Sequence, residues 1–117
     1  MKTYEAQEQE ALFMWAEIQT NKHPELDLLF AIPNGGSRHK LEAYNLKKQG
    51  VRSGVPDICL AVGRGNYISL YIEMKIKPNK PSANQKMWIE KLRKYGNKVE
   101  VCYNWEEAKN EILKYLG

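Results

Sequence analysis

Two acidic side chains and one lysine are spaced so that a β-hairpin would bring them together. Glu73 and Lys75 lie two residues apart in the segment YIEMK, and Asp57 begins the preceding apolar segment DICLAV. Side chains two residues apart on a strand project from the same face, about 6–7 Å apart along the strand. The intervening GRGN is typical of a tight turn, and antiparallel pairing about it places Asp57 opposite residues near 73. A register slip of two residues would keep Asp57 on the same face.

This arrangement indicates a particular chemistry. Two neighbouring carboxylates repel each other, and their burial is costly unless positive charge lies between them. Lys75 supplies part of that charge, and a hard divalent cation such as Mg²⁺ or Mn²⁺ would supply the rest through oxygen ligands. Such a cation polarises a phosphate and activates water, while a lysine orients that water or stabilises the developing charge. The pattern therefore predicts phosphodiester hydrolysis, although spacing alone also allows an ordinary solvated strand face.

The composition is that of one small folded domain. The chain has 117 residues, 43% of them hydrophobic, and a formal net charge of +4, so we expect a single domain over residues 1–117. It contains neither an apolar run of about 18 residues nor an apolar segment after a basic N-terminus, which argues against a membrane span and a signal peptide. Cys59 and Cys102 lie in apolar segments, which predicts buried thiols in a reduced, cytoplasmic protein.

Periodicity and turn residues predict alternating helices and strands. We expect helices over 4–20, 39–49, 83–95 and about 104–116, and strands over 28–32, 57–62, 67–75 and 98–103. Ser82 is placed to cap the third helix at its N-terminus, and Gly96 to end it. A hairpin followed by a β-α-β crossover predicts a mixed sheet flanked by helices, which is an α/β fold.

Basic residues are concentrated around the predicted carboxylate site. Residues 75–98 contain eight Lys or Arg against one acidic residue, and residues 38–52 contain five against one. Clusters of this kind suit the phosphate backbone of nucleic acid, although a solvated helix face is the alternative. The glycines before Arg38 would let a backbone approach phosphate closely. The candidates for DNA binding are Arg38, Lys47, Lys48 and Arg52, whereas the three tryptophans are interpreted as core or interface residues.

Four separated motifs carry a resemblance to a known family. They are FAIPNGGSR (30–38), GVRSGVPDICL (50–60), IEMK (72–75) and PSANQKMWIEKLRKYG (81–96). In this order they resemble the virus-type replication-repair nuclease (VRR-NUC) family of the PD-(D/E)XK superfamily, from about Glu5 to the last strand. The resemblance implies a restriction-endonuclease-like αβββαβ core with a divalent-metal active site. It also implies that Asp57 and Glu73 are metal ligands and that Lys75 is catalytic.

The resemblance suggests two further site residues. A glutamate on the first helix usually completes the family's site, and Glu5 followed four residues later by Gln9 fits that pattern. Glu8 shares a helix face with apolar residues and is the competitor; the helical period permits both, and we favour Glu5. Gln85 matches a glutamine near the scissile phosphate in the helix after the lysine strand, with an ordinary first-turn residue as the alternative.

The resemblance therefore implies a metal-dependent, structure-selective DNA endonuclease. Small stand-alone members resemble Holliday-junction resolvases, which implies a homodimer acting with two-fold symmetry on four-way, branched DNA. The family also suggests a viral origin, and hence the host-cell cytoplasm. One alternative is a monomeric nuclease acting on flaps or nicked ends. The other is a nucleic-acid-binding module in which the acidic cluster is only structural.

Overall fold

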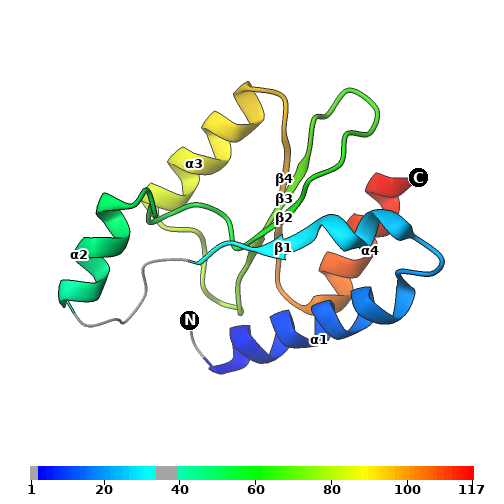
Figure 1. Cartoon of the computed structure of the whole chain (residues 1–117), viewed down its shortest axis with the longest axis horizontal. Coiled ribbons are helices and arrows are strands. Elements are labelled where there is room, and N and C mark those ends of the chain that lie inside the picture. The colour runs from blue at the N-terminus through cyan, green and yellow to red at the C-terminus, as the bar shows by residue number, and fades with distance from the viewer. Residues whose placement is uncertain (1–2, 34–39) are drawn as a thin grey trace.

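The computed structural model describes residues 3–33 and 40–117, so the predicted DNA-binding residue Arg38 lies outside the described residues. The predicted order of helices and strands is confirmed, with one added 3₁₀ helix, η1 (Figure 1). The elements are α1 (Thr3–Gln19), η1 (Pro24–Leu28), β1 (Leu29–Ala31), α2 (Lys40–Lys48), β2 (Ile58–Leu60), β3 (Leu70–Met74), α3 (Ala83–Lys94), β4 (Lys98–Cys102) and α4 (Trp105–Leu116).

The four strands form one mixed sheet, as predicted, and their order in it is β1-β2-β3-β4. Strand β2 is antiparallel to both β1 and β3, and β4 runs parallel to β3 after the crossover through α3. Ile58 pairs with Ile72, so the adjoining residue Asp57 comes opposite Glu73 at the end of the hairpin. The sheet topology therefore brings together the two carboxylates that are 16 positions apart in the chain.

The two central strands are shorter than predicted because the turn and the strands differ in register. Arg64 and Tyr67 exchange both backbone hydrogen bonds across the turn, at 3.0 and 2.9 Å. Continuing from this bridge would pair Leu60 with Tyr71, but Leu60 pairs with Leu70. This one-residue offset interrupts the ladder next to the turn, so regular pairing is confined to β2 and β3 as given above.

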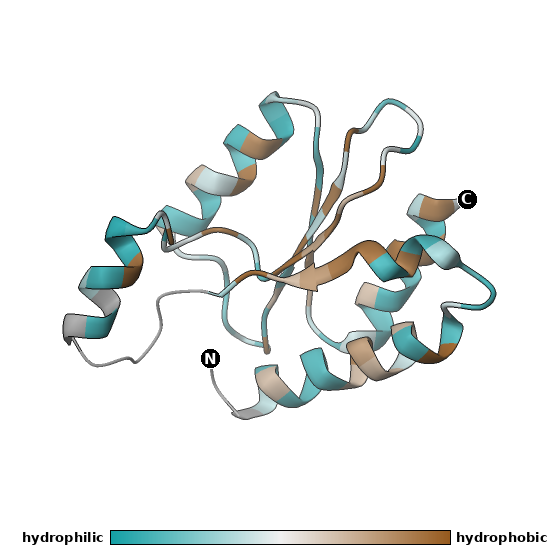
Figure 2. Ribbon diagram, viewed as in Figure 1, coloured by the Kyte–Doolittle hydropathy of each residue, from teal (hydrophilic) through white to brown (hydrophobic). Residues whose placement is uncertain are grey.

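A single hydrophobic core lies between one face of the sheet and the helices α1 and α4. Leu12 and Ala16 of α1 and Ile112 of α4 are buried there with Ile72 and Met74 of β3. Figure 2 shows hydrophobic residues along β1 and in α4, whereas α2 and α3 carry mainly hydrophilic residues. Because side chains alternate along a strand, burial of Ile72 and Met74 on this face sends the intervening glutamate to the face near α3.

The two cysteines are buried and unpaired, as predicted. Burial raises the pKa of the Cys102 thiol to about 12, which keeps it protonated and chemically inert at neutral pH. Within residues 3–33 and 40–117, no helix combines the length and the apolar character needed to cross a membrane.

Candidate functional site

Asp57 is held at the junction between loop and sheet by backbone groups of both neighbouring strands. Its Oδ2 accepts a hydrogen bond from the backbone N–H of Met74 at 2.8 Å, and its carbonyl accepts one from Ile32 at 2.7 Å. The carboxyl group thus takes the place of a backbone acceptor where the β2–β3 ladder ends. Only 6% of Asp57 is exposed, so its position is fixed by packing as well as by hydrogen bonding.

Glu73 is the most deeply buried acidic residue that the structure describes. It is 1% exposed, and its Oε2 accepts a hydrogen bond from the side-chain Nε2 of Gln85 at 3.2 Å. Its other oxygen, Oε1, is buried and has no hydrogen-bond donor among the described residues. The pKa of Glu73 is raised to about 9. Burial is the largest cause, and the negative charge of Asp57 and a hydrogen bond with the Asp57 side chain add to it. An anion in this position needs a proton or a cation for compensation.

Lys75 continues β3 on the same face and supplies positive charge to this pair. Its backbone N–H donates to the carbonyl of Cys102 at 2.9 Å, which anchors the residue to β4. Its charge acts against the other influences on Glu73 by lowering the pKa of that carboxyl. No hydrogen bond or ion pair joins the Lys75 ammonium to another described side chain. Its three N–H donors are therefore available to a ligand.

The two candidate glutamates of α1 have different surroundings. The charge of Glu5 contributes to raising the pKa of Glu73, which places Glu5 within electrostatic reach of the carboxylate pair. Glu8 instead accepts a hydrogen bond through Oε1 from the backbone N–H of Trp105, at 2.8 Å. That N–H is one of the unpaired donors at the first turn of α4, so Glu8 joins α1 to α4. The helical period of the sequence could not separate these roles.

The side-chain amide of Gln85 takes part in the N-terminal cap of α3 and also contacts Glu73. Ser82 and Gln85 form a capping box in which Ser82 Oγ accepts from the Gln85 backbone N–H at 3.2 Å. In return, Gln85 Oε1 accepts from the Ser82 backbone N–H at 2.8 Å. This bond fixes the orientation of the amide and directs Nε2 toward Glu73. The Ser-x-x-Gln spacing is a capping signal in the sequence, but the bond to Glu73 depends on the sheet.

The donor chemistry of the site fits a divalent cation. Asp57 and Glu73 present carboxylate oxygens on one face, and the buried Oε1 of Glu73 has no described donor. Within the described part of the chain, no cluster of three or more His, Cys, Asp or Glu could hold an ion. Two carboxylates completed by water and phosphate are a usual way of binding Mg²⁺. The residues present are therefore compatible with the cation that the sequence predicts.

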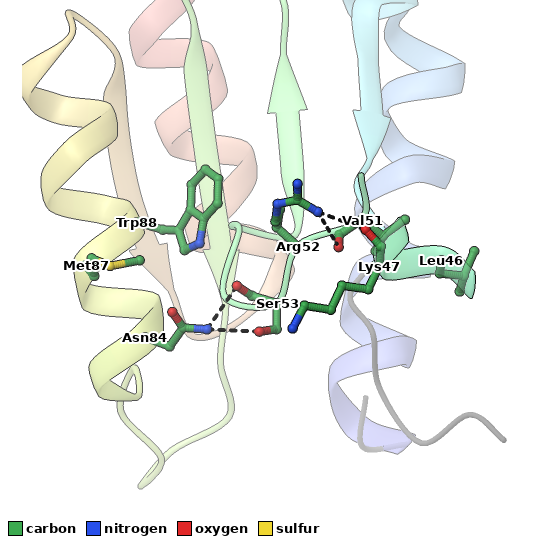
Figure 3. A pocket seen from close by; sticks show the side chains of 8 residues that line it. All are labelled: Leu46, Lys47, Val51, Arg52, Ser53, Asn84, Met87 and Trp88. Atoms are coloured by element: carbon green, nitrogen blue, oxygen red, sulfur yellow. Dashed lines mark hydrogen bonds between the residues drawn. The ribbon is translucent and has the colours of Figure 1, made fainter. Parts of the chain in front are cut away.

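A cavity of about 420 Å³ lies between α2, the segment 51–53 and α3 (Figure 3). Two of the predicted DNA-binding residues, Lys47 and Arg52, line it. Arg52 Nη1 donates to the carbonyl of Lys47 at 3.0 Å, which links the end of α2 to the segment that leads to Asp57. Lys48 lies elsewhere, with its ammonium 5.1 Å from the centre of the Tyr44 ring. The structure thus brings Lys47 and Arg52 together but does not bring Lys48 to this cavity.

Comparisons with known proteins agree with this geometry. The VRR-NUC domain model matches residues 2–105. A solved structure named "VRR_NUC domain protein" has a TM-score of 0.83 and 28% sequence identity, and the match covers 99% of this chain and 90% of that chain. The comparison with curated proteins gives no match. The chain therefore belongs to the VRR-NUC domain family and is a nuclease domain of the PD-(D/E)XK type.

Proposed function

We propose that this chain is a divalent-metal-dependent endonuclease that hydrolyses phosphodiester bonds in branched DNA. The observation that carries the proposal is the meeting of Asp57 and Glu73 on one sheet face, with a buried oxygen of Glu73 that has no described donor. In a nuclease domain the burial of two carboxylates has a function, because Asp57 and Glu73 would hold a cation whose positive charge compensates theirs.

The proposed roles follow from the contacts of each side chain. Asp57 and Glu73 would hold Mg²⁺ or Mn²⁺, which when bound supplies positive charge to the scissile phosphate and lowers the pKa of water. The ammonium of Lys75 orients the attacking water and stabilises the charge that develops on the phosphate oxygens. Gln85 fixes the orientation of Glu73 through its Nε2. Glu5, within electrostatic reach of Glu73, completes the acidic group.

The basic residues beside the site support a DNA substrate. Lys47 lies in the last turn of α2, and Arg52 lies in the segment that leads from α2 to Asp57. From these positions they would contact phosphates on either side of the cut. We assign the same backbone-binding role to Lys48 and Arg38. A homodimer would present two such sites with two-fold symmetry to a four-way junction. The buried thiols of Cys59 and Cys102 are compatible with the cytoplasm.

A cleavage panel tests this function. We expect cleavage of four-way junctions with Mg²⁺ or Mn²⁺, no cleavage with EDTA, and the mass of a dimer in solution. Cleavage of flaps and nicked duplexes by a monomer would replace the junction proposal with the simpler nuclease. If none of the duplex, nicked, flap and four-way DNAs is cut with either metal, the chain is a binding module and the catalytic proposal is wrong.

The two glutamates of α1 give a matched pair of variants. Glu5→Gln should lower metal-dependent cleavage by about 10-fold or more without changing stability, because its charge acts on the carboxylate site. Glu8→Ala should lower the free energy of unfolding by about 1 kcal/mol, because the first turn of α4 loses an acceptor. Cleavage per folded molecule should stay close to that of the parent. Thermal unfolding and single-turnover cleavage measure both effects, and exchanged phenotypes would reverse the assignment.

A further inference from the structure

The cavity beside the carboxylate site has an apolar wall facing a basic one. Trp88 and Met87 of α3 form the apolar wall, and Trp88 projects from the helix toward the segment that carries Arg52 (Figure 3). Lys47 and Arg52 bring two positive charges to the other side. The volume of about 420 Å³ lies within the roughly 300–1,000 Å³ typical of small-ligand sites. The roles proposed above give no function to the apolar wall.

Trp88 occupies this position because of a glycine in the facing segment. Gly54 has a φ of +93°, and a Cβ atom there would lie 2.9 Å from Cδ1 of the Trp88 ring. The edge of the indole therefore packs directly against backbone. Trp15 and Trp105 pack against the hydrophobic core as predicted, whereas Trp88 lines the cavity. Trp88 is half-buried, and its indole N–H has no hydrogen-bond partner among the described residues, so this donor is free.

Where α3 borders the cavity, the side chain of Asn84 is held in one orientation by Ser53. Asn84 Nδ2 donates to the carbonyl of Ser53 at 2.9 Å and to its Oγ at 3.0 Å. Because the Ser53 carbonyl can only accept, the amide orientation is fixed. Asn84 Oδ1 is then left as an acceptor, and the Ser53 hydroxyl keeps its proton as a donor. A donor and an acceptor side by side suit the edge of a nucleobase.

The cavity adjoins the proposed site of cleavage. Asn84 immediately precedes Gln85, whose side chain donates to Glu73. Ser53 lies four positions before Asp57 on the segment that enters β2. A DNA strand with its phosphate at the carboxylates would therefore carry a neighbouring nucleotide toward this cavity.

We propose that the cavity binds one unpaired nucleobase of the DNA strand that is cut. The base stacks on Trp88, and Lys47 and Arg52 contact the adjoining phosphates. Stacking on an aromatic ring tolerates any base, and the basic side matches the charge of the backbone. The inference rests on the proposed nuclease function and narrows its substrate class. A continuous duplex keeps its bases stacked internally, whereas DNA with an unpaired nucleotide beside the cut can fill the cavity.

Binding to matched DNAs in EDTA tests this proposal without any cleavage. The probes are a fluorescein-labelled duplex with one unpaired thymidine, the same duplex with an abasic site at that position, and a fully paired duplex, all at one salt concentration. We expect the parent protein to bind the thymidine DNA about 5- to 150-fold more tightly than the abasic DNA, the range for one stacked base. Trp88→Leu should bind these two DNAs equally.

Tyr95→Leu is the matched control, since Tyr95 is an exposed aromatic residue at the C-cap of α3 and does not line the cavity. It should retain the full preference for the unpaired thymidine. The proposal is overturned if the parent binds the thymidine and abasic DNAs equally, or if a folded Trp88→Leu variant keeps the preference. If Trp88→Leu fails to fold, the comparison of the two DNAs with the parent decides. Because no metal is present, failure of the cleavage panel and failure of this binding test are separate results.

Discussion

Replacing Lys75 with alanine is expected to reduce metal-dependent cleavage by about 10²–10³-fold or more, with folding and DNA affinity close to those of the parent. The ammonium lies on the same strand face as Glu73, and it has no hydrogen bond or ion pair with another described side chain. Its loss removes charge from the place where negative charge develops, and no described group replaces it. Single-turnover cleavage at saturating enzyme measures the chemical step, and anisotropy measures DNA affinity.

Lys77→Ala is the matched control for this prediction. Lys77 is exposed two positions further along the chain, with its ammonium 5.7 Å from the centre of the Tyr103 ring. Its removal lowers the net charge by the same amount and should leave the rate within about two-fold of the parent. Lys75→Arg should recover only part of the activity, because a planar guanidinium donates with a different geometry. Equal losses in Lys75→Ala and Lys77→Ala would remove Lys75 from the mechanism.

Replacing Glu73 with glutamine should abolish cleavage and yet stabilise the metal-free fold at alkaline pH. Burial and the charge of Asp57 raise the pKa of Glu73 from 4.5 to about 9 in the folded state. The folded protein thus holds a proton that the unfolded chain releases above pH 4.5, so the free energy of unfolding falls as the pH rises from 4.5 to 9. A glutamine does not titrate, and it keeps an oxygen acceptor for Gln85.

Thermal and denaturant unfolding in EDTA measure this effect. At pH 8 we expect the variant to exceed the parent by roughly 2–4 kcal/mol, and at pH 5 we expect the difference to disappear. Adding Mg²⁺ should stabilise the parent at pH 8 and leave the variant unchanged. Glu90→Gln, at an exposed position of α3, is the control and should match the parent at both pH values. A variant less stable than the parent at pH 8 would contradict the assigned environment of Glu73.

Local patterns in the sequence predict which strands form the centre of the candidate site. The alternation of Ile72, Glu73 and Met74 separates core from polar face, and the short GRGN connection makes β2 and β3 antiparallel neighbours. The one-residue offset beside the turn is what sets Asp57 opposite Glu73. The alternation and the antiparallel pairing depend only on strand geometry and on a short connection, whereas the offset does not follow from either. The capping of α3 by Ser82 followed from the same kind of short-range signal.

The rest depends on contacts between distant segments, which periodicity does not encode. Glu8 bonds to Trp105, 97 positions away, so the helical pattern of α1 alone gave no means of choosing between Glu5 and Glu8. Trp88 is the same residue type as the tryptophans that pack against the core. Only the folded structure shows that it packs beside Gly54 and lines a cavity. In each case the role of the residue depends on a partner in a distant segment, and a single sequence does not show which segments lie close together.

The docking of α1 against α4 also determines when the site can assemble during synthesis. Leu12 and Ala16 are buried against a core that includes Ile112, so α1 has no complete packing surface until α4 has been made. Asp57, Glu73 and Lys75 can come together in the hairpin of a nascent chain, but Glu5 joins them only when α1 has docked. A ribosome-bound chain still lacking α4 would therefore hold an incomplete acidic group, and its full activity would arise only after α4 has been translated.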